Sequence, residues 1–237
     1  MKLKAKVFSH KQLIGTADLQ VGDESMGCVF GEFIPTDNYY NGIQEAVWEF
    51  WKTNKPDYQK WYSLRFNVQL DNGYFLFAAG GFTFDDVPEL PNEPKRIDIA
   101  GLDRPVIEDF FLQDIPRPFV EEPWSEITIG QKITFEDELK KEIGTSDKRT
   151  SLLDFVKPKQ DKHVLIDFEV SALCTDQRND DVLFVVRKIE FDKQFAVVHL
   201  TWRGKIESKD FPNTQFYNDF DDFKYSRMYA DKADWEN

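Results

Sequence analysis

The residue types in this chain that most often carry chemistry are its three histidines and two cysteines. His10, His163 and His199 stand apart from one another, and no HExxH or CxxC metal-binding spacing occurs. We therefore expect no structural zinc. His199 lies in the apolar run FAVVHLTW, which favours a histidine packed within a strand over a catalytic base.

A thiol nucleophile needs a histidine close in space, and Cys28 with His199 is the pair to consider. Cys28 sits in a strand-like apolar segment, as does Cys174, so buried free thiols are the stronger expectation. Neither a GxSxG elbow nor a phosphate-binding GxGxxG or GxxxxGK[ST] loop occurs. A hydrolase would have to use a site that these motifs do not describe.

Aspartates cluster at 85–86, 180–181 and 219–222, and such clusters can bind Mg²⁺ in phosphodiesterase-like sites. Asp57 and Glu93 imitate a PD…ExK nuclease pattern, but the prolines beside Glu93 disfavour the strand that this motif occupies. The net charge of −13, shared by both halves of the chain, also repels nucleic acid and anionic lipid. We therefore expect no metal or other cofactor, no nucleic-acid partner and no membrane partner.

The C-terminal segment FPNTQFYNDFDDFKYSRMYADKADW, residues 211–235, mixes aromatic side chains with carboxylates. Aromatic anchors framed by acid suit a surface that docks a basic protein, because rings supply binding energy and charge speeds the encounter. The alternative is an amphipathic segment whose Phe216, Phe220 and Phe223 complete a core. The docking interpretation predicts partner-binding side chains at Asp180, Asp181, Tyr217, Asp219, Asp221, Asp222 and Phe223.

The elements that position these residues are predicted from periodicity and turn signals. Alternating polarity indicates strands, helical spacing indicates helices, and Asn72-Gly73 indicates a tight hairpin turn. In the first half these signals predict strands at 3–8, 13–19, 26–34, 64–70, 74–79 and 96–100, with helices at 36–54, capped by Thr36 or Asp37, and 106–112. In the second half they predict strands at 127–133, 164–173, 182–191 and 195–202, with helices at 136–143, capped by Thr134, and 217–229.

The proline-rich stretch 116–123 separates the two halves. We expect two α+β domains, residues 1–118 and 119–237, each a mainly antiparallel sheet packed with one or two helices. The first residues, MKLKAKVFSHKQ, contain no apolar run typical of a signal peptide, and no stretch approaches 18 apolar residues. The cytoplasm is the expected compartment.

Two stretches stand out, namely IGTADLQ…SMGCVFGEFIPTDNYY, at residues 14–40, and NDDVLFVV…FAVVHLTWRGK…FPNTQFYNDFDDF, at residues 179–223. Both resemble uncharacterised bacterial proteins of toxin-immunity (antitoxin) type. Together they cover about half of the chain. The resemblance implies a small acidic protein that binds and silences a cognate toxin without catalysis of its own.

The leading hypothesis is therefore a non-enzymatic immunity-type protein that neutralises a basic toxin with carboxylates and aromatic side chains. A structural or oligomeric scaffold protein is one alternative. A hydrolase with an unrecognised carboxylate or metal site is the other.

Overall fold

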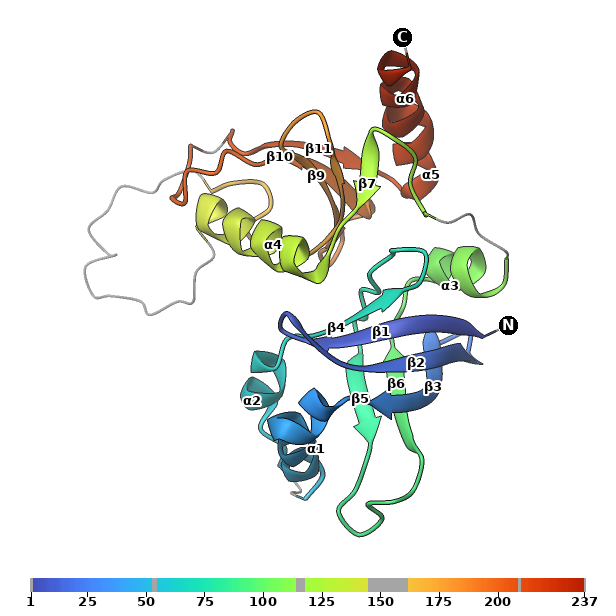
Figure 1. Ribbon diagram of the computed structural model, residues 1–237. Coiled ribbons are helices and arrows are strands. Elements are labelled where there is room, and N and C mark those ends of the chain that lie inside the picture. Colours follow the sequence, from blue (N-terminus) through green and yellow to red (C-terminus); the bar gives the residue numbers. More distant parts are fainter. Residues whose placement is uncertain (1, 53–54, 114–117, 145–161, 209, 237) are drawn as a thin grey trace, which may run out of the picture. The chain divides into compact units, whose positions relative to one another are not determined.

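The computed structural model describes residues 2–52, 55–113, 118–144, 162–208 and 210–236. The chain divides into two compact units, Met1–Phe119 and Val120–Asn237, which we call the N-terminal and C-terminal units. Each contains one antiparallel sheet with helices (Figure 1), so the expected α+β fold with two sheets is confirmed. The expected division fell between residues 118 and 119.

The N-terminal unit is built on a six-stranded sheet with the order β4-β1-β2-β3-β6-β5. Neighbouring strands all run antiparallel, and alternate side chains of β1, β2 and β3 are buried, as period-two alternation requires. Its strands are β1 (Leu3–Ser9), β2 (Gln12–Asp23), β3 (Cys28–Pro35), β4 (Phe66–Leu70), β5 (Gly81–Asp85) and β6 (Lys95–Ala100). Its helices are η1 (Tyr39–Ile43), α1 (Gln44–Trp51), α2 (Tyr58–Ser63) and α3 (Arg104–Phe111).

The helix expected at 36–54 forms, but with a break. Gly42 adopts a φ of 125°, a conformation that glycine tolerates best, and places a kink within η1, ahead of α1. Thr36 does not cap this helix, because its hydroxyl donates to the carbonyl of Leu13.

The strand expected at 74–79 is wrong. Tyr74 and Phe75 are buried as expected, but Gln69 to Phe75 is the sole bridge that this segment makes within the described residues. Tyr74 stacks on Phe110 of α3 at a ring distance of 4.3 Å, which draws the chain away from a regular ladder. The sheet is completed instead by β5, which the sequence analysis did not predict.

The C-terminal unit has a five-stranded antiparallel sheet with the order β11-β10-β9-β8-β7. Helix α4 lies along β8, and the C-terminal helical segment begins beside β11 (Figure 1). Its strands are β7 (Trp124–Glu126), β8 (Glu169–Asp176), β9 (Asp181–Arg187), β10 (Phe195–His199) and β11 (Asn213–Tyr217). Its helices are α4 (Ile129–Ile143), followed at the C-terminus by α5 (Phe220–Phe223), η3 (Lys224–Met228) and α6 (Tyr229–Trp235).

Helix α4 corrects the expectation of a strand at 127–133. Thr128, rather than Thr134, is the N-cap, and it forms a reciprocal capping box with Gln131. The helix ends as predicted at Gly144, which adopts the left-handed conformation with φ 79°. Four charged side chains of α4 are buried, namely Lys132, Glu136, Glu138 and Glu142.

The remaining strands are shorter than expected. β9 ends at Arg187 and β10 at His199, while β11 was not predicted. The expected helix at 217–229 begins at Phe220 instead. Among the described residues, no helix combines the length and apolar character needed to span a membrane.

Candidate interaction site

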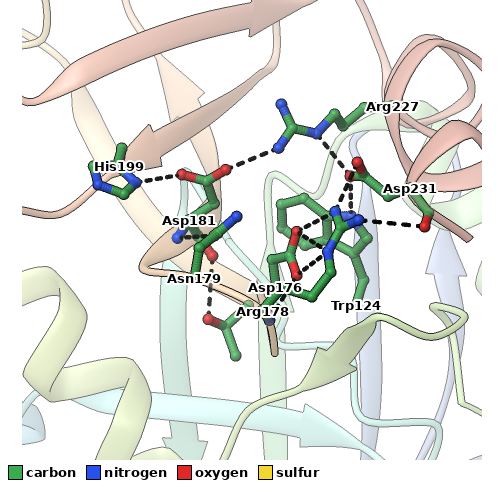
Figure 2. Close-up of polar contacts among 9 residues, drawn as sticks. Trp124, Asp176, Arg178, Asn179, Asp181, His199, Arg227 and Asp231 are labelled. Atoms are coloured by element: carbon green, nitrogen blue, oxygen red, sulfur yellow. Dashed lines mark hydrogen bonds and ion pairs between the residues drawn. The ribbon is translucent and has the colours of Figure 1, made fainter. Parts of the chain in front are cut away.

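Charged side chains converge in the C-terminal unit where β8 ends and β9 begins (Figure 2). The strand register places His199, the last residue of β10, opposite Asp181, the first residue of β9. Asp176 ends β8, and Arg227 and Asp231 come from the C-terminal helical segment. We call this group, together with Arg178 and Trp124, the ionic network.

One branch of the ionic network runs from the sheet to the helical segment. His199 Nδ1 lies 2.8 Å from Asp181 Oδ1. Arg227 donates to Asp181 Oδ2 at 2.8 Å and to Asp231 Oδ2 at 2.7 Å. Burial disfavours the Arg227 cation, but the bond to Asp231 outweighs it, so the pKa of Arg227 lies above its ordinary value.

The second branch of the ionic network also reaches Asp231, through Arg178 and Trp124. Arg178 contacts Asp176 and Asp231, each at 2.7 Å, and the side chain of Asp176 is completely buried. Trp124 Nε1 donates to Asp231 at 2.9 Å. Burial alone would raise the pKa of Asp231, but the bonds from Arg178, Trp124 and Arg227 hold it below its ordinary value. The ionic network therefore fastens the C-terminal helical segment to the sheet.

His199 is not the packed strand histidine that its apolar neighbours indicated. Its side chain is 49% exposed, because β10 ends at this residue. An imidazole oriented by a carboxylate can act as a general base. In the part of the chain that the structure describes, however, His199 bonds to no serine, threonine or cysteine.

The thiols do not complete a catalytic arrangement. Cys174 is fully buried, and burial raises the pKa of its thiol well above the ordinary value, which disfavours a nucleophilic thiolate. Cys28 belongs to the N-terminal unit and is half-buried. Among the described residues, no group of three or more His, Cys, Asp or Glu side chains could hold a metal ion.

The aromatic members of the predicted docking surface are placed incorrectly by the sequence analysis. Tyr217 is 2% exposed and Phe223 is fully buried, where it packs edge-on against Trp124 at 4.9 Å and Tyr217 at 5.6 Å. These rings complete the core of the C-terminal unit. The Tyr217 hydroxyl has no hydrogen-bond partner in the described part of the chain, and burial raises the pKa of Tyr217 to about 12.

Three of the five predicted aspartates serve internal contacts. Asp219 caps α5 by accepting from the backbone N–H of Asp222 at 2.8 Å, and Asp222 accepts from both nitrogens of Asn218. Asp181 belongs to the ionic network. Asp180 and Asp221 remain exposed, although Asp221 pairs with Lys224 and Asp180 accepts from Trp202.

The exposed rings of this segment are Tyr225 and Tyr229, which the sequence analysis left out. Tyr225 is 72% exposed and Tyr229 is 36% exposed, and their ring centroids lie 5.4 Å apart. They follow Asp221 at intervals of four residues, a spacing that could have identified them. We call Asp221, Tyr225 and Tyr229 the C-terminal stripe.

No protein-family model matches the chain, and no curated protein and no solved structure matches it significantly.

Proposed function

We propose that this chain is a non-enzymatic binding protein of bacterial immunity type, which neutralises a basic protein toxin. The observation that carries the proposal is the C-terminal stripe, where two neighbouring tyrosines are exposed beside a carboxylate. Tyrosine contributes large contact area with few rotatable bonds, and tyrosines are frequent among the side chains that dominate binding energy.

Charge supports a basic partner. The chain has a net charge of −13, and the segment that carries the stripe adds exposed carboxylates at Asp219, Asp234 and Glu236. Such a field raises the association rate with a cationic protein and penalises acidic competitors. Binding would place carboxylates and rings over the cationic cleft of the toxin, so no reaction by this chain is required.

The ionic network supplies rigidity to this surface. Arg227 and Asp231 lie on the same helical segment as the two tyrosines and bond it to strand β9 and to the turn between β8 and β9. A segment fixed before binding loses less conformational entropy on association. The buried charges would thus support affinity without touching the partner.

The direct test is binding of the full chain to the protein encoded next to it in its genome. The expected result is tight binding whose association rate falls between about 50 mM and about 300 mM salt, because screening weakens steering. Binding that is undetectable at low salt would refute the proposal.

Alanine at both Tyr225 and Tyr229 is expected to weaken binding by about 2 kcal/mol or more, as for central interface residues. The matched control is alanine at Tyr58 and Tyr62, a second pair of exposed tyrosines four residues apart in α2. The control is expected to bind as the unaltered chain does. Equal losses for both variants would mean that the stripe is not the site.

A further inference from the structure

The backbone after β10 contains an unusual residue. Trp202 adopts a φ of 56°, in the left-handed region that bulky side chains rarely occupy. Holding a non-glycine residue there is energetically unfavourable, and such residues cluster at functional sites. The surrounding structure must therefore stabilise this loop.

Two carboxylates of α4 provide that stabilisation. Glu142 Oε1 accepts hydrogen bonds from Thr201 N at 2.9 Å, Thr201 Oγ1 at 2.8 Å and Trp202 N at 2.7 Å. Glu138 Oε1 accepts from Gly204 N at 2.7 Å. Successive backbone N–H groups that converge on one anion form a nest, and here the anion comes from within the fold.

This arrangement is unfavourable in itself. Glu142 is completely buried, its Oε2 finds no hydrogen-bond partner among the described residues, and burial raises its pKa above the ordinary value. A desolvated carboxyl oxygen of α4 and a left-handed tryptophan thus meet at one contact between the helix and the loop. The fold accepts both costs where the backbone positions the Trp202 side chain at the surface.

The side chain held in this way offers a ring beside a carboxylate. The indole is 43% exposed and rests edge-on against Phe135, with centroids 5.9 Å apart. Its Nε1 donates to Asp180 Oδ1 at 2.9 Å. Among the described residues, Asp180 has no ionic partner and no cation lies over the Trp202 ring.

We infer that Trp202 and Asp180 form a recognition site for one cationic side chain, an arginine or lysine, of a protein partner. Tryptophan is the strongest aromatic partner for a cation, and an adjacent carboxylate adds a charge-assisted hydrogen bond. The inference rests on the proposed function, because it takes the cationic side chain to come from a basic protein partner. It adds a second contact point, separate from the C-terminal stripe.

The charges around the site agree with a cationic ligand. Arg203 is paired with Glu207 at 3.5 Å, and Lys141 with Glu138 at 3.1 Å. These two cations are thus matched by carboxylates of their own, and among the described residues Asp180 has no ionic partner. An arriving cation therefore meets attraction from Asp180 without competition from a resident partner.

The experiment uses ¹⁹F NMR of the full chain labelled with 5-fluorotryptophan, titrated with a short oligo-arginine peptide. The chain has six tryptophans, and Trp202→Phe identifies the resonance of Trp202 by its loss. We expect this resonance to move saturably with peptide. Asp180→Asn keeps an acceptor for the indole but removes the charge, and should weaken the peptide affinity about fivefold.

Trp51 serves as the internal control in the same spectrum. It is 48% exposed, but its Nε1 donates to the backbone carbonyl of Phe84 at 2.7 Å and not to a carboxylate. Its resonance should stay in place. A Trp202 resonance that does not move, equal movement of both resonances, or an Asp180→Asn affinity equal to that of the unaltered chain would each overturn the inference.

The Trp202 site and the immunity function can be refuted independently of each other. Binding to the genomic neighbour's product that depends on Tyr225 and Tyr229 and is unchanged by Trp202→Leu would overturn the Trp202 site and leave the immunity function standing. A saturable Trp202 response to the peptide, with no binding to that product, would support the cation site and contradict the immunity function.

Discussion

The two units have similar sheets but treat buried charge differently. In the N-terminal unit, the buried charged residues among those described are Asp86 and Lys95, which lie 3.4 Å apart beside the aromatic core. In the C-terminal unit, six charged residues are buried, namely Lys132, Glu136, Glu138, Glu142, Asp176 and Asp181. A sheet of this kind therefore does not require such charges in order to fold.

The difference indicates what the additional charges do. In the C-terminal unit, some of them bond to segments that carry exposed aromatic side chains: Asp181 accepts from Arg227 in the helical segment of Tyr225, and Glu142 accepts from the loop of Trp202. Lys132 and Glu136 instead bond to each other and to strand β8. Replacing buried ion pairs with apolar residues is often neutral or stabilising, so their presence calls for a reason other than stability. We assign that reason to the presentation of surface side chains, which makes the C-terminal unit the place to test for binding.

The largest effect is expected from Arg178→Met, which leaves the buried Asp176 without its cation. We expect a loss of about 3 kcal/mol in unfolding free energy, at the lower end for buried pairs because the Arg178 side chain is 26% exposed. Urea unfolding measures it. The control is Arg104→Met in the N-terminal unit, whose partner Glu108 is exposed, and it should leave the curve unchanged. Similar unfolding curves for the two variants would show that the ion pair between Arg178 and Asp176 contributes no more to stability than an exposed pair does.

Tyr39→Phe tests the surroundings of the buried Asp86–Lys95 pair in the N-terminal unit. Tyr39 donates to Asp86 Oδ2 at 2.7 Å, so its removal takes a hydrogen bond from a buried carboxylate and should cost about 1.5–3 kcal/mol. Thermal unfolding is the measurement. Tyr40→Phe, at a neighbouring residue that is exposed, should change stability by less than about 0.5 kcal/mol. If Tyr39→Phe is equally silent, the hydrogen bond from Tyr39 to Asp86 contributes little to the stability of the N-terminal unit.

Acidification should destabilise the C-terminal unit through His163. This buried side chain contacts the Pro212 carbonyl at 3.0 Å with Nε2 and accepts from Leu165 N with Nδ1, which requires the neutral ring. Burial lowers the pKa of His163 in the folded state, so the unfolded chain binds more protons and stability falls as pH drops below about 6.5. Unfolding curves at about pH 8 and about pH 5.5 measure the slope. His163→Gln should reduce it, whereas His10→Asn, on an exposed turn, should not.

Glu142 should also make stability depend on pH, but more weakly than His163 does and in the opposite direction. Its folded-state pKa is raised, so the folded chain binds more protons and the contribution of Glu142 to stability falls as pH rises from about 4 to about 7. The measurement compares the unaltered chain with Glu142→Gln across this range. The stability of the unaltered chain relative to the variant should decline toward neutral pH. A constant difference would show that Glu142 titrates as it does in the unfolded chain.

Local patterns predicted the fold class because alternation and capping signals act over few residues. Gly144 ended α4 as expected, and β1 and β2 followed their alternating polarity. Thr128 and Thr134 are both plausible caps by type, and only the partner of each hydroxyl separates them: Thr128 accepts from Gln131 N, while Thr134 donates to Gly130 O. Residues 74–79 failed because stacking of Tyr74 on Phe110, a contact distant in sequence, competed with strand pairing.

The candidate site was predicted only in part, and for a related reason. The aromatic and acidic segment was identified, and Asp180 and Asp221 are indeed exposed. Which aromatic rings face the core depends on how the helix is rotated about its axis, and amino-acid composition does not specify that rotation. Trp202 had no local signal at all, because its conformation depends on Glu142, which lies 60 residues earlier in the chain.

The π-helical turn η3 makes the length of the C-terminal segment as important as its composition. A π-helical turn contains one more residue than an α-helical turn. The residues that follow it are therefore rotated about the helix axis by roughly 100°. Loss of a single residue within Lys224–Met228 would restore a regular helix and turn Asp231 away from Arg178 and Trp124. Substitutions on the outer face of this segment should thus be well tolerated by the fold, whereas one-residue deletions should not. Related sequences would be expected to vary in its residues and to conserve its spacing.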